Sequence, residues 1–329
     1  MSSSQLMRLL SSNPSQIKSN ISNRVPDRLK SNSATAAALE FIVAKAFSFL
    51  FKVPLVTSPK DYCVAWSGDV EGFSCSASND ADIMCYLHGY YLWIEVTLST
   101  NAHQASQEFS QALRHFDNAV SGGTIDNLES FVFLVAPVFH QDTFTQYHTI
   151  AQDGSRKVVL LSTRNLSKLL RIATKLSHLG INLIHQDVMS VIIDLHKKLK
   201  DAQTLISYEQ EVSSTIAALR VEIMKKKYHQ FLSVQSYRIL TQVWKKGRRY
   251  VSANEINLEL KRNEEVNSYC DDIGKVFGVL EVTQAIERSG IASIVENNIH
   301  PEPLFIRLPI SDISMNFENL VETLKSFER

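Results

Sequence analysis

The sequence predicts an α/β fold, in which an N-terminal domain with a mixed sheet precedes a mainly helical domain. Three observations carry this prediction. Residues 131–139, FVFLVAPVF, form a continuous apolar run that is typical of a strand buried on both faces of a sheet. Residues 81–100, ADIMCYLHGYYLWIEVTLST, have the composition of two strands around a tight turn at His88-Gly89. After about residue 183, apolar residues recur at helical spacing instead.

The N-terminal domain is predicted to mix helices and strands in the order expected of an α/β domain. Residues 34–51, ATAAALEFIVAKAFSFLF, predict a mostly apolar helix behind Ser33, which suits an N-cap. A strand is expected in DYCVAWSG, ahead of the hairpin of residues 81–100. Beyond the hairpin, the pattern predicts helices over 103–119 and 164–177 and strands over 131–139 and 158–162, with a helix between them.

The C-terminal part is predicted to be almost entirely helical over 185–244 and again over 266–288, with a turn at Gly247 and an N-cap at Ser252. The stretch GIASIVENNIHPEPLFIRLP reads as two short strands. Helices followed by a two-stranded ribbon fit a winged helix, placed at 229–310. A chain of 329 residues suggests two domains. We therefore divide it into a helical or flexible segment, a first domain and a second domain, at 1–33, 34–183 and 184–329.

Composition excludes several classes of protein. The charged fraction of 21% and apolar fraction of 44% are ordinary for a globular protein, and the formal net charge is zero. The four cysteines form no CxxC pair, so neither a zinc site nor a disulfide framework is indicated. The N-terminus lacks the apolar core of a secretory signal, and no run approaches the roughly 20 apolar residues of a membrane span. A cytoplasmic protein without membrane contact is expected.

The hairpin carries two carboxylates that call for an explanation. Asp82 opens one strand, and Glu95 lies on the next, between Ile94 and Val96. Cross-strand neighbours approach to about 5 Å between Cβ atoms, so a hairpin of this length brings both side by side. Two carboxylates at that distance repel unless a cation sits between them. A hard divalent ion with oxygen ligands would relieve this repulsion, polarise a phosphate and lower the pKa of a bound water.

Further polar residues surround this pair in the sequence. Glu40 lies on the preceding predicted helix. Glu108 and His115 lie on the following one, seven residues apart and hence on one face, which Gln104 shares. His115 has the chemistry of a general base or of a hydrogen-bond donor to a phosphate.

A Glu on a helix, then Asp, then Glu on the second strand of a hairpin resembles the PD-(D/E)XK nuclease superfamily. Most of these nucleases have Lys two residues after the Glu, where this chain has Thr97. The form Asp-x12-Glu-Val-Thr resembles the cleavage domain of AlwI-like type IIS restriction and nicking endonucleases, over roughly residues 34–140. In that group a Glu on the following helix and a His seven residues later complete the site, which are the positions of Glu108 and His115 here.

The resemblance implies a restriction-endonuclease-like domain that hydrolyses phosphodiester bonds in double-stranded DNA with Mg²⁺, for which Mn²⁺ would substitute. Asp82, Glu95 and the Val96 carbonyl would bind the metal, Glu40 and Glu108 would assist, and His115 would act as base or phosphate contact. One site cuts one strand, so a double-strand break needs a second protomer or a partner subunit. In nicking enzymes of this group the cleavage domain is C-terminal, whereas here it is N-terminal.

Other interpretations stay open at this point. Asp82 alone is also what an ordinary strand end carries, and Glu95 fits the exposed face of an edge strand. The missing Lys supports a non-catalytic DNA-binding or assembly subunit with a degenerate nuclease fold. A transposon-linked or repair nuclease is a further alternative.

A basic segment in the second domain predicts contact with the DNA backbone. Residues 197–262 hold 14 Lys and Arg against 6 Asp and Glu. Such an excess favours binding to phosphates, which positions a duplex without specifying its sequence. Asn254 follows a turn and is placed to reach base edges from a helix start. The predicted DNA contacts are Lys245, Lys246, Arg248, Arg249 and Asn254.

Overall fold

The computed structural model describes residues 2–22, 32–58, 62–67, 81–102, 104–105, 113–114, 116–117, 128–181, 183–248, 250–295 and 304–307. The chain divides into two compact units. Unit 1 consists of Met1–Thr174 and Leu183–Ala217, and unit 2 of Lys175–Asn182 and Ala218–Arg329. The domain boundaries expected from the sequence stay a prediction, and the division of the structure differs from them by assigning the segment 184–217 to unit 1.

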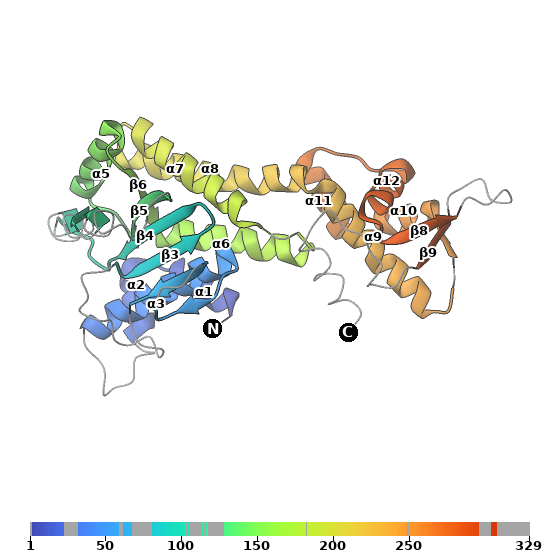
Figure 1. Ribbon diagram of the computed structural model, residues 1–329, viewed down its shortest axis with the longest axis horizontal. Helices are drawn as coiled ribbons and strands as arrows, with labels where there is room; N and C mark the ends of the chain where they lie inside the picture. The colour runs from blue at the N-terminus through green and yellow to red at the C-terminus, as the bar shows by residue number, and fades with distance from the viewer. Residues whose placement is uncertain are drawn as a thin grey trace. The chain divides into compact units, whose positions relative to one another are not determined.

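Unit 1 is built on a six-stranded mixed sheet in the order β1-β2-β3-β4-β5-β6 (Figure 1). Strands β1 and β2 are parallel, the pairs β2–β3 and β3–β4 are antiparallel, and β4, β5 and β6 are parallel. The mixed sheet predicted from the sequence is therefore confirmed. The strands are Leu55–Val56, Cys63–Trp66, Ile83–Leu87, Tyr90–Val96, Glu129–Ala136 and Lys157–Ser162.

The hairpin is formed by β3 and β4, as expected. Ile83 pairs with Ile94 and Leu87 with Tyr90, and Gly89 takes the turn with a φ of 78°. Glycine adopts this left-handed backbone without the steric cost that a Cβ brings. The turn therefore fixes the register, and the register decides which residues of β3 and β4 stand opposite each other.

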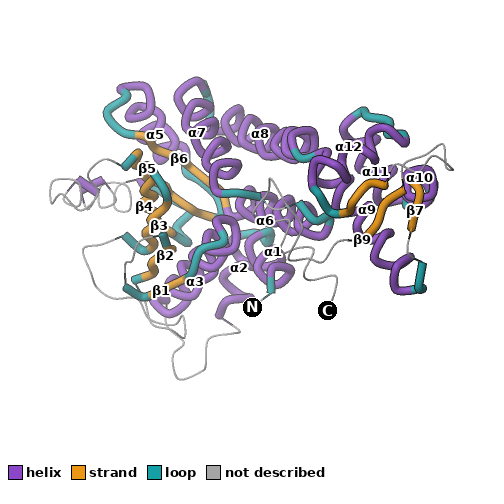
Figure 2. Tube along the Cα trace, turned by 45° about the vertical axis from the view of Figure 1, so that its right-hand side comes forward, coloured by secondary structure: helices purple, strands orange, loops and turns teal. Residues whose placement is uncertain are grey.

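Helices pack on both faces of this sheet (Figure 2). On one face, α3 sets the rings of Phe41 and Phe47 against Trp66 and Phe133, with ring centroids 4.9 and 6.0 Å apart. On the other face, Trp93 contacts Phe116 at 6.1 Å. The helices that lie in unit 1 or begin there are α1 Ser3–Leu10, α2 Pro14–Ser22, α3 Asn32–Phe51, α5 Gln141–Asp153, α6 Thr163–His178, α7 His185–Asp201 and α8 Leu205–Lys226.

Unit 2 combines helices with a three-stranded antiparallel sheet in the order β7-β9-β8. Ser252 caps α10 through a capping box with Glu255, as the predicted N-cap requires. The stretch 266–288 is two helices instead of one, because Gly274 ends α11 in the left-handed conformation. The elements are α9 Tyr228–Lys245, β7 Tyr250–Ser252, α10 Ala253–Lys261, α11 Glu264–Ile273, α12 Val279–Ser289, β8 Ala292–Val295 and β9 Leu304–Arg307.

In the part of the chain that the structure describes, none of the helices is both long and apolar enough to span a membrane.

Candidate active site

The structure brings Asp82 and Glu95 together at one end of the hairpin, where β3 begins and β4 ends. Because Ile83 pairs with Ile94, one further step of the same register sets Asp82 opposite Glu95. Asp82 Oδ2 accepts a hydrogen bond from the Val96 amide at 2.8 Å. The Asp82 carbonyl oxygen accepts from the amide and hydroxyl of Ser67, at 3.2 and 3.3 Å. These bonds hold Asp82 on both sides, beyond the last residue pair of the β3–β4 ladder.

Glu95 is oriented by a neighbour on its own strand. The Trp93 indole Nε1–H donates to Glu95 Oε1 at 2.9 Å. Residues i and i+2 of a strand share a face, so this bond follows from the alternation along β4. Trp93 is buried, while Glu95 is half-buried. Hydrogen bonds to an ionised group are stronger than those between neutral groups, and this one limits the orientations open to the carboxylate.

The Val96 carbonyl faces the same side as Asp82. Along a strand, the N–H and C=O of one residue point to one edge, and those of the next residue point to the other. The Val96 amide donates to Asp82, and the Thr97 amide donates to the Val135 carbonyl at 3.0 Å on the opposite edge. The Val96 carbonyl therefore points toward β3, where Asp82 lies.

Thr97 occupies the position at which the nucleases that the sequence resembles usually carry Lys. The side chain is 5% exposed, and its Oγ1 accepts a hydrogen bond from the Ser99 amide at 3.0 Å. The hydroxyl thus shapes the turn that follows β4. No positive charge reaches the carboxylates from this position.

Glu40 lies on α3 and is buried, at 5% exposure. This helix packs on the sheet face that carries Trp66 and Phe133, whereas alternation sets Glu95 on the face of Trp93. Within the described residues, no three Asp, Glu, His or Cys side chains form a group that could hold a metal ion. The structure joins Asp82 to Glu95, and the role of Glu40 stays a prediction.

The remaining predicted site residues, Glu108 and His115, lie outside the described residues. Gln104, expected on the same helix face, is described and is fully buried. Its Nε2 donates to the carbonyls of Ser99 and Val138 at 2.7 and 3.0 Å, and its Oε1 accepts from the His140 amide at 2.9 Å. Gln104 therefore ties the loop after β4 to the loop after β5.

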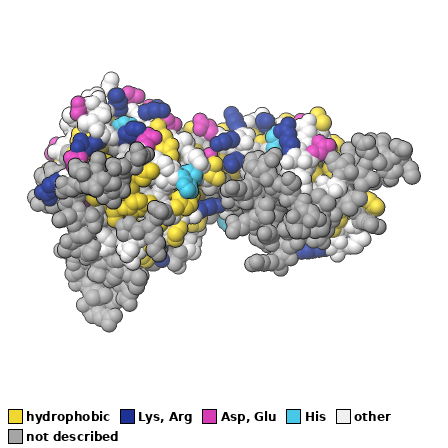
Figure 3. Space-filling view, in the orientation of Figure 1, with side chains coloured by type: hydrophobic (Ala, Val, Ile, Leu, Met, Phe, Trp, Pro, Cys, Tyr) yellow, Lys and Arg dark blue, Asp and Glu magenta, His cyan; other side chains and the backbone are white. Residues whose placement is uncertain are grey.

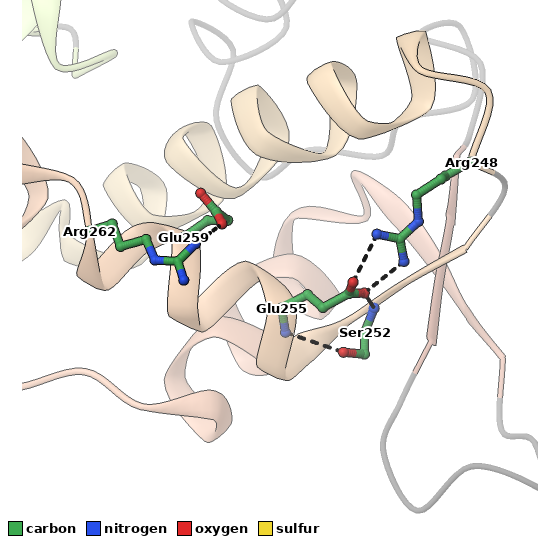
Figure 4. Close-up of polar contacts among 5 residues, drawn as sticks. All are labelled: Arg248, Ser252, Glu255, Glu259 and Arg262. Atoms are coloured by element: carbon green, nitrogen blue, oxygen red, sulfur yellow. Dashed lines mark hydrogen bonds and ion pairs between the residues drawn. The ribbon is translucent and has the colours of Figure 1, made fainter.

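In the basic segment of unit 2, Lys245, Lys246 and Arg248 are exposed, and Asn254 is half-buried. Arg248 is already engaged: its two terminal nitrogens donate to the two oxygens of Glu255 at 2.8 and 3.0 Å (Figure 4). This bidentate contact lowers the pKa of Glu255. Arg249 lies outside the described residues. On the face drawn in Figure 3, Lys and Arg side chains lie interspersed with Asp and Glu.

Comparison with known proteins finds a family match in the N-terminal part of the chain. Residues 11–159 match the family model described as AlwI restriction endonuclease. This segment is AlwI-like. The resemblance that the sequence predicts is thereby confirmed, and the AlwI-like segment contains Asp82, Glu95 and the whole of the β3–β4 hairpin.

Among solved structures, one match is the small subunit (R.BspD6I2) of the heterodimeric restriction endonuclease R.BspD6I. It is 15% identical, with a TM-score of 0.43, over 58% of this chain and 95% of that one. No curated protein matches the chain.

One contributor to the site escaped the sequence reasoning. Trp93 reads as a core aromatic residue, and its indole is indeed buried. The spacing of two residues between Trp93 and Glu95 was the available signal, because a strand sets both side chains on one face.

Proposed function

We propose that the protein is a Mg²⁺-dependent DNA endonuclease of the restriction type, whose active site is formed in unit 1. The observation that carries the proposal is the placement of Asp82 opposite Glu95, where β3 begins and β4 ends, within the AlwI-like segment. Two carboxylates side by side repel, and a cation bound to both would relieve that repulsion.

The donor set fits Mg²⁺. Two carboxylates and a peptide carbonyl are hard oxygen ligands, which this ion prefers over nitrogen or sulfur. Asp82, Glu95 and the Val96 carbonyl would hold it. When bound, the ion would stabilise negative charge on the phosphate and lower the pKa of a bound water.

The chain's own residues position this chemistry. The Val96 amide and Ser67 hold Asp82, and Trp93 holds Glu95, so neither carboxylate needs to be ordered when substrate arrives. We assign Glu40 and Glu108 to orienting water or a second ion, and His115 to accepting a proton or contacting the phosphate. Because Thr97 carries no charge, the compensating positive charge comes from another group.

Unit 2 is proposed to bind the DNA duplex through a winged helix. Support comes from the order of its elements, in which α9, β7, α10, α11 and α12 precede β8 and β9, and from the three-stranded sheet. Lys245 and Lys246 are exposed and suit contacts with phosphates. Arg248, Arg249 and Asn254 complete the proposed surface. Arg248 must leave Glu255 before it contacts DNA with both nitrogens.

A double-strand break requires two active sites, so we propose that the protein works as a homodimer or with a partner subunit. A single site of this kind hydrolyses one strand. The protein alone is then expected to nick supercoiled plasmid, and paired sites convert the nicked product to linear DNA.

The test is incubation of supercoiled plasmid with the protein in Mg²⁺ and in EDTA. Metal-dependent nicking, alone or with the product of a neighbouring gene, is the expected result. A protein that binds DNA and never cuts it would support the second candidate, a non-catalytic assembly subunit. That candidate is favoured by Thr97, which stands where Lys is usual and uses its hydroxyl within the turn.

A further inference from the structure

A cavity lies near the end of the sheet that carries Asp82 and Glu95. It has a volume of about 580 Å³ and opens beside β1 and β2, against α3. Its volume falls within the range of small-molecule binding sites. The lining consists of Phe41, Lys45, Leu55, Val56, Thr57, Ser58 and Trp66.

The lining combines one cation, an aromatic wall and two hydroxyls. The Lys45 ammonium lies 4.5 Å from the centroid of the Phe41 ring, and that ring lies 4.9 Å from Trp66. Of the described residues around the cavity, Lys45 is the one that carries a charge. Within the described part of the chain it forms no ion pair, so its charge is available to an anion.

The cavity and the carboxylates lie at the same end of the strands. Trp66 is the last residue of β2, and the next residue, Ser67, donates to the Asp82 carbonyl. Thr57 follows β1, and the register of β1 against β2 sets it beside Trp66. Neighbouring strands are about 4.8 Å apart, so the cavity begins one to two strand spacings from Asp82.

The cavity and the carboxylates lie on different faces of the sheet at that end. Trp66 and Phe41 lie on the α3 face, and Glu95 lies on the face of Trp93. A DNA strand bound at both features would therefore have to cross the end of β2 and β3. Thr57 and Ser58 line the cavity, and the Ser67 hydroxyl donates to the Asp82 carbonyl.

We infer that this cavity binds the nucleotide next to the scissile phosphate, with Lys45 on its phosphate and the half-buried Phe41 ring, backed by the buried Trp66, against its sugar or base. The inference rests on the proposed nuclease function and names a substrate subsite for it. A point charge suits phosphate, and aromatic side chains support nucleotides regardless of sequence. Lys45 thus supplies from α3 a positive charge that Thr97 cannot supply from β4.

The experiment measures DNA affinity by fluorescence anisotropy in Ca²⁺, which is a hard cation with the same oxygen preference as Mg²⁺. Lys45→Met keeps an apolar stem without the charge, and Lys45→Arg keeps the charge. Lys157→Met is the matched control, because Lys157 is an exposed Lys of the same unit that begins β6 at the other end of the sheet. Thermal unfolding of each variant shows whether it folds.

A variant that loses one phosphate contact should bind DNA about eightfold more weakly than the wild type at 0.1 M salt, if the two bind equally at 1 M salt. The slope of its log affinity against log salt concentration should be smaller by about one. Lys45→Met should show this loss, while Lys45→Arg and Lys157→Met should not. Lys45→Met and Lys157→Met with equal affinities and salt slopes would overturn the inference and leave the nuclease proposal standing. A wild type that neither binds nor cuts DNA with metal would remove the nuclease proposal and the inference with it.

A second measurement locates the contact on the DNA. Once the cut position is mapped, oligonucleotides with a neutral methylphosphonate at the phosphate next to it are compared with unmodified DNA. If Lys45 binds that phosphate, the losses from Lys45→Met and from the methylphosphonate are not additive. Fully additive losses at both neighbouring phosphates would show that Lys45 contacts neither, and the subsite assignment would fall.

Discussion

The acidic pair of unit 1 and the basic segment of unit 2 show how differently like charges are treated in one chain. Asp82 and Glu95 are set opposite each other, and hydrogen bonds from the Val96 amide and the Trp93 indole orient their carboxylates. Arg248, by contrast, already has its counter-charge in Glu255.

This difference separates two kinds of charge cluster. Two carboxylates side by side repel each other, and a cation that binds both relieves this repulsion. A cluster with internal ion pairs must break them before it binds a ligand, so part of its binding free energy is offset. We therefore expect the strongest functional effects at the acidic pair and weaker effects in the basic segment.

The largest effect is expected from Glu95→Gln. The amide keeps the shape and an acceptor for Trp93 but loses the charge that binds the cation. Cutting of plasmid should fall roughly 1,000-fold, about 4 kcal/mol in activation free energy, with DNA binding retained. Glu129→Gln is the matched control, because Glu129 begins β5 at the other end of the sheet and pairs with Lys157. Equal cutting by both variants would reject the assigned site.

The basic segment offers the next largest effect. Changing Lys245 and Lys246 together to Met should weaken DNA binding roughly 60-fold at 0.1 M salt and lower the salt slope by about two, because both side chains are exposed. Arg248→Met should have a smaller effect, since Arg248 is held by Glu255. If Arg248→Met weakens binding as much as one Lys change does, the ion pair opens at no measurable cost. The pairing with Glu255 would then not weaken the contribution of Arg248 to DNA binding.

Much of unit 1 was predictable because its signals are local. The apolar run of β5, the β3–β4 hairpin and helix α3 each follow from residues adjacent in the chain. The register that sets Asp82 opposite Glu95 follows from the position of Gly89 alone. What local pattern could not give are contacts between distant segments. Gln104 forms hydrogen bonds with Val138 and His140, which are 34 and 36 residues away in the chain, and no sequence periodicity predicts these contacts.

The same limit applies to charge. Arg248 and Glu255 are seven residues apart, on either side of a strand and a capping box, and the sequence shows only a basic stretch. The position of α3, which carries Glu40, is set in the same way. The sheet face that this helix covers depends on Phe41 and Phe47 meeting Trp66 and Phe133.

A smaller effect is expected from Trp93→Phe. The change removes the indole N–H and leaves Glu95 less firmly oriented. A hydrogen bond to a charged group contributes about 1.5–3 kcal/mol, and we expect the lower end of this range because Glu95 is only half-buried. Cutting should therefore fall roughly tenfold, and the Mg²⁺ concentration for half-maximal rate should rise. Trp244→Phe removes a buried indole N–H that has no hydrogen-bond partner in the described part of the chain, and should leave the Mg²⁺ dependence unchanged. A slower Trp93→Phe enzyme with the Mg²⁺ dependence of the wild type would indicate lost packing instead.

The smallest effect concerns stability, and it tests whether the Arg248–Glu255 pair exists in solution. Hydrogen bonds from Arg248 lower the pKa of Glu255 in the folded protein. The unfolded chain then binds the proton more readily, so the pair stabilises the fold at neutral pH, and this contribution is lost as pH falls below about 4. Because both side chains are largely exposed, the contribution should stay below about 1 kcal/mol. Thermal unfolding of wild type and Arg248→Gln should therefore differ slightly at pH 7 and converge near pH 3, with the difference at pH 7 reduced in 1 M salt. A difference that persists unchanged at pH 3 would mean that Arg248 stabilises the fold through the packing of its stem, and the basic segment would then be less neutralised than the contacts of Glu255 indicate.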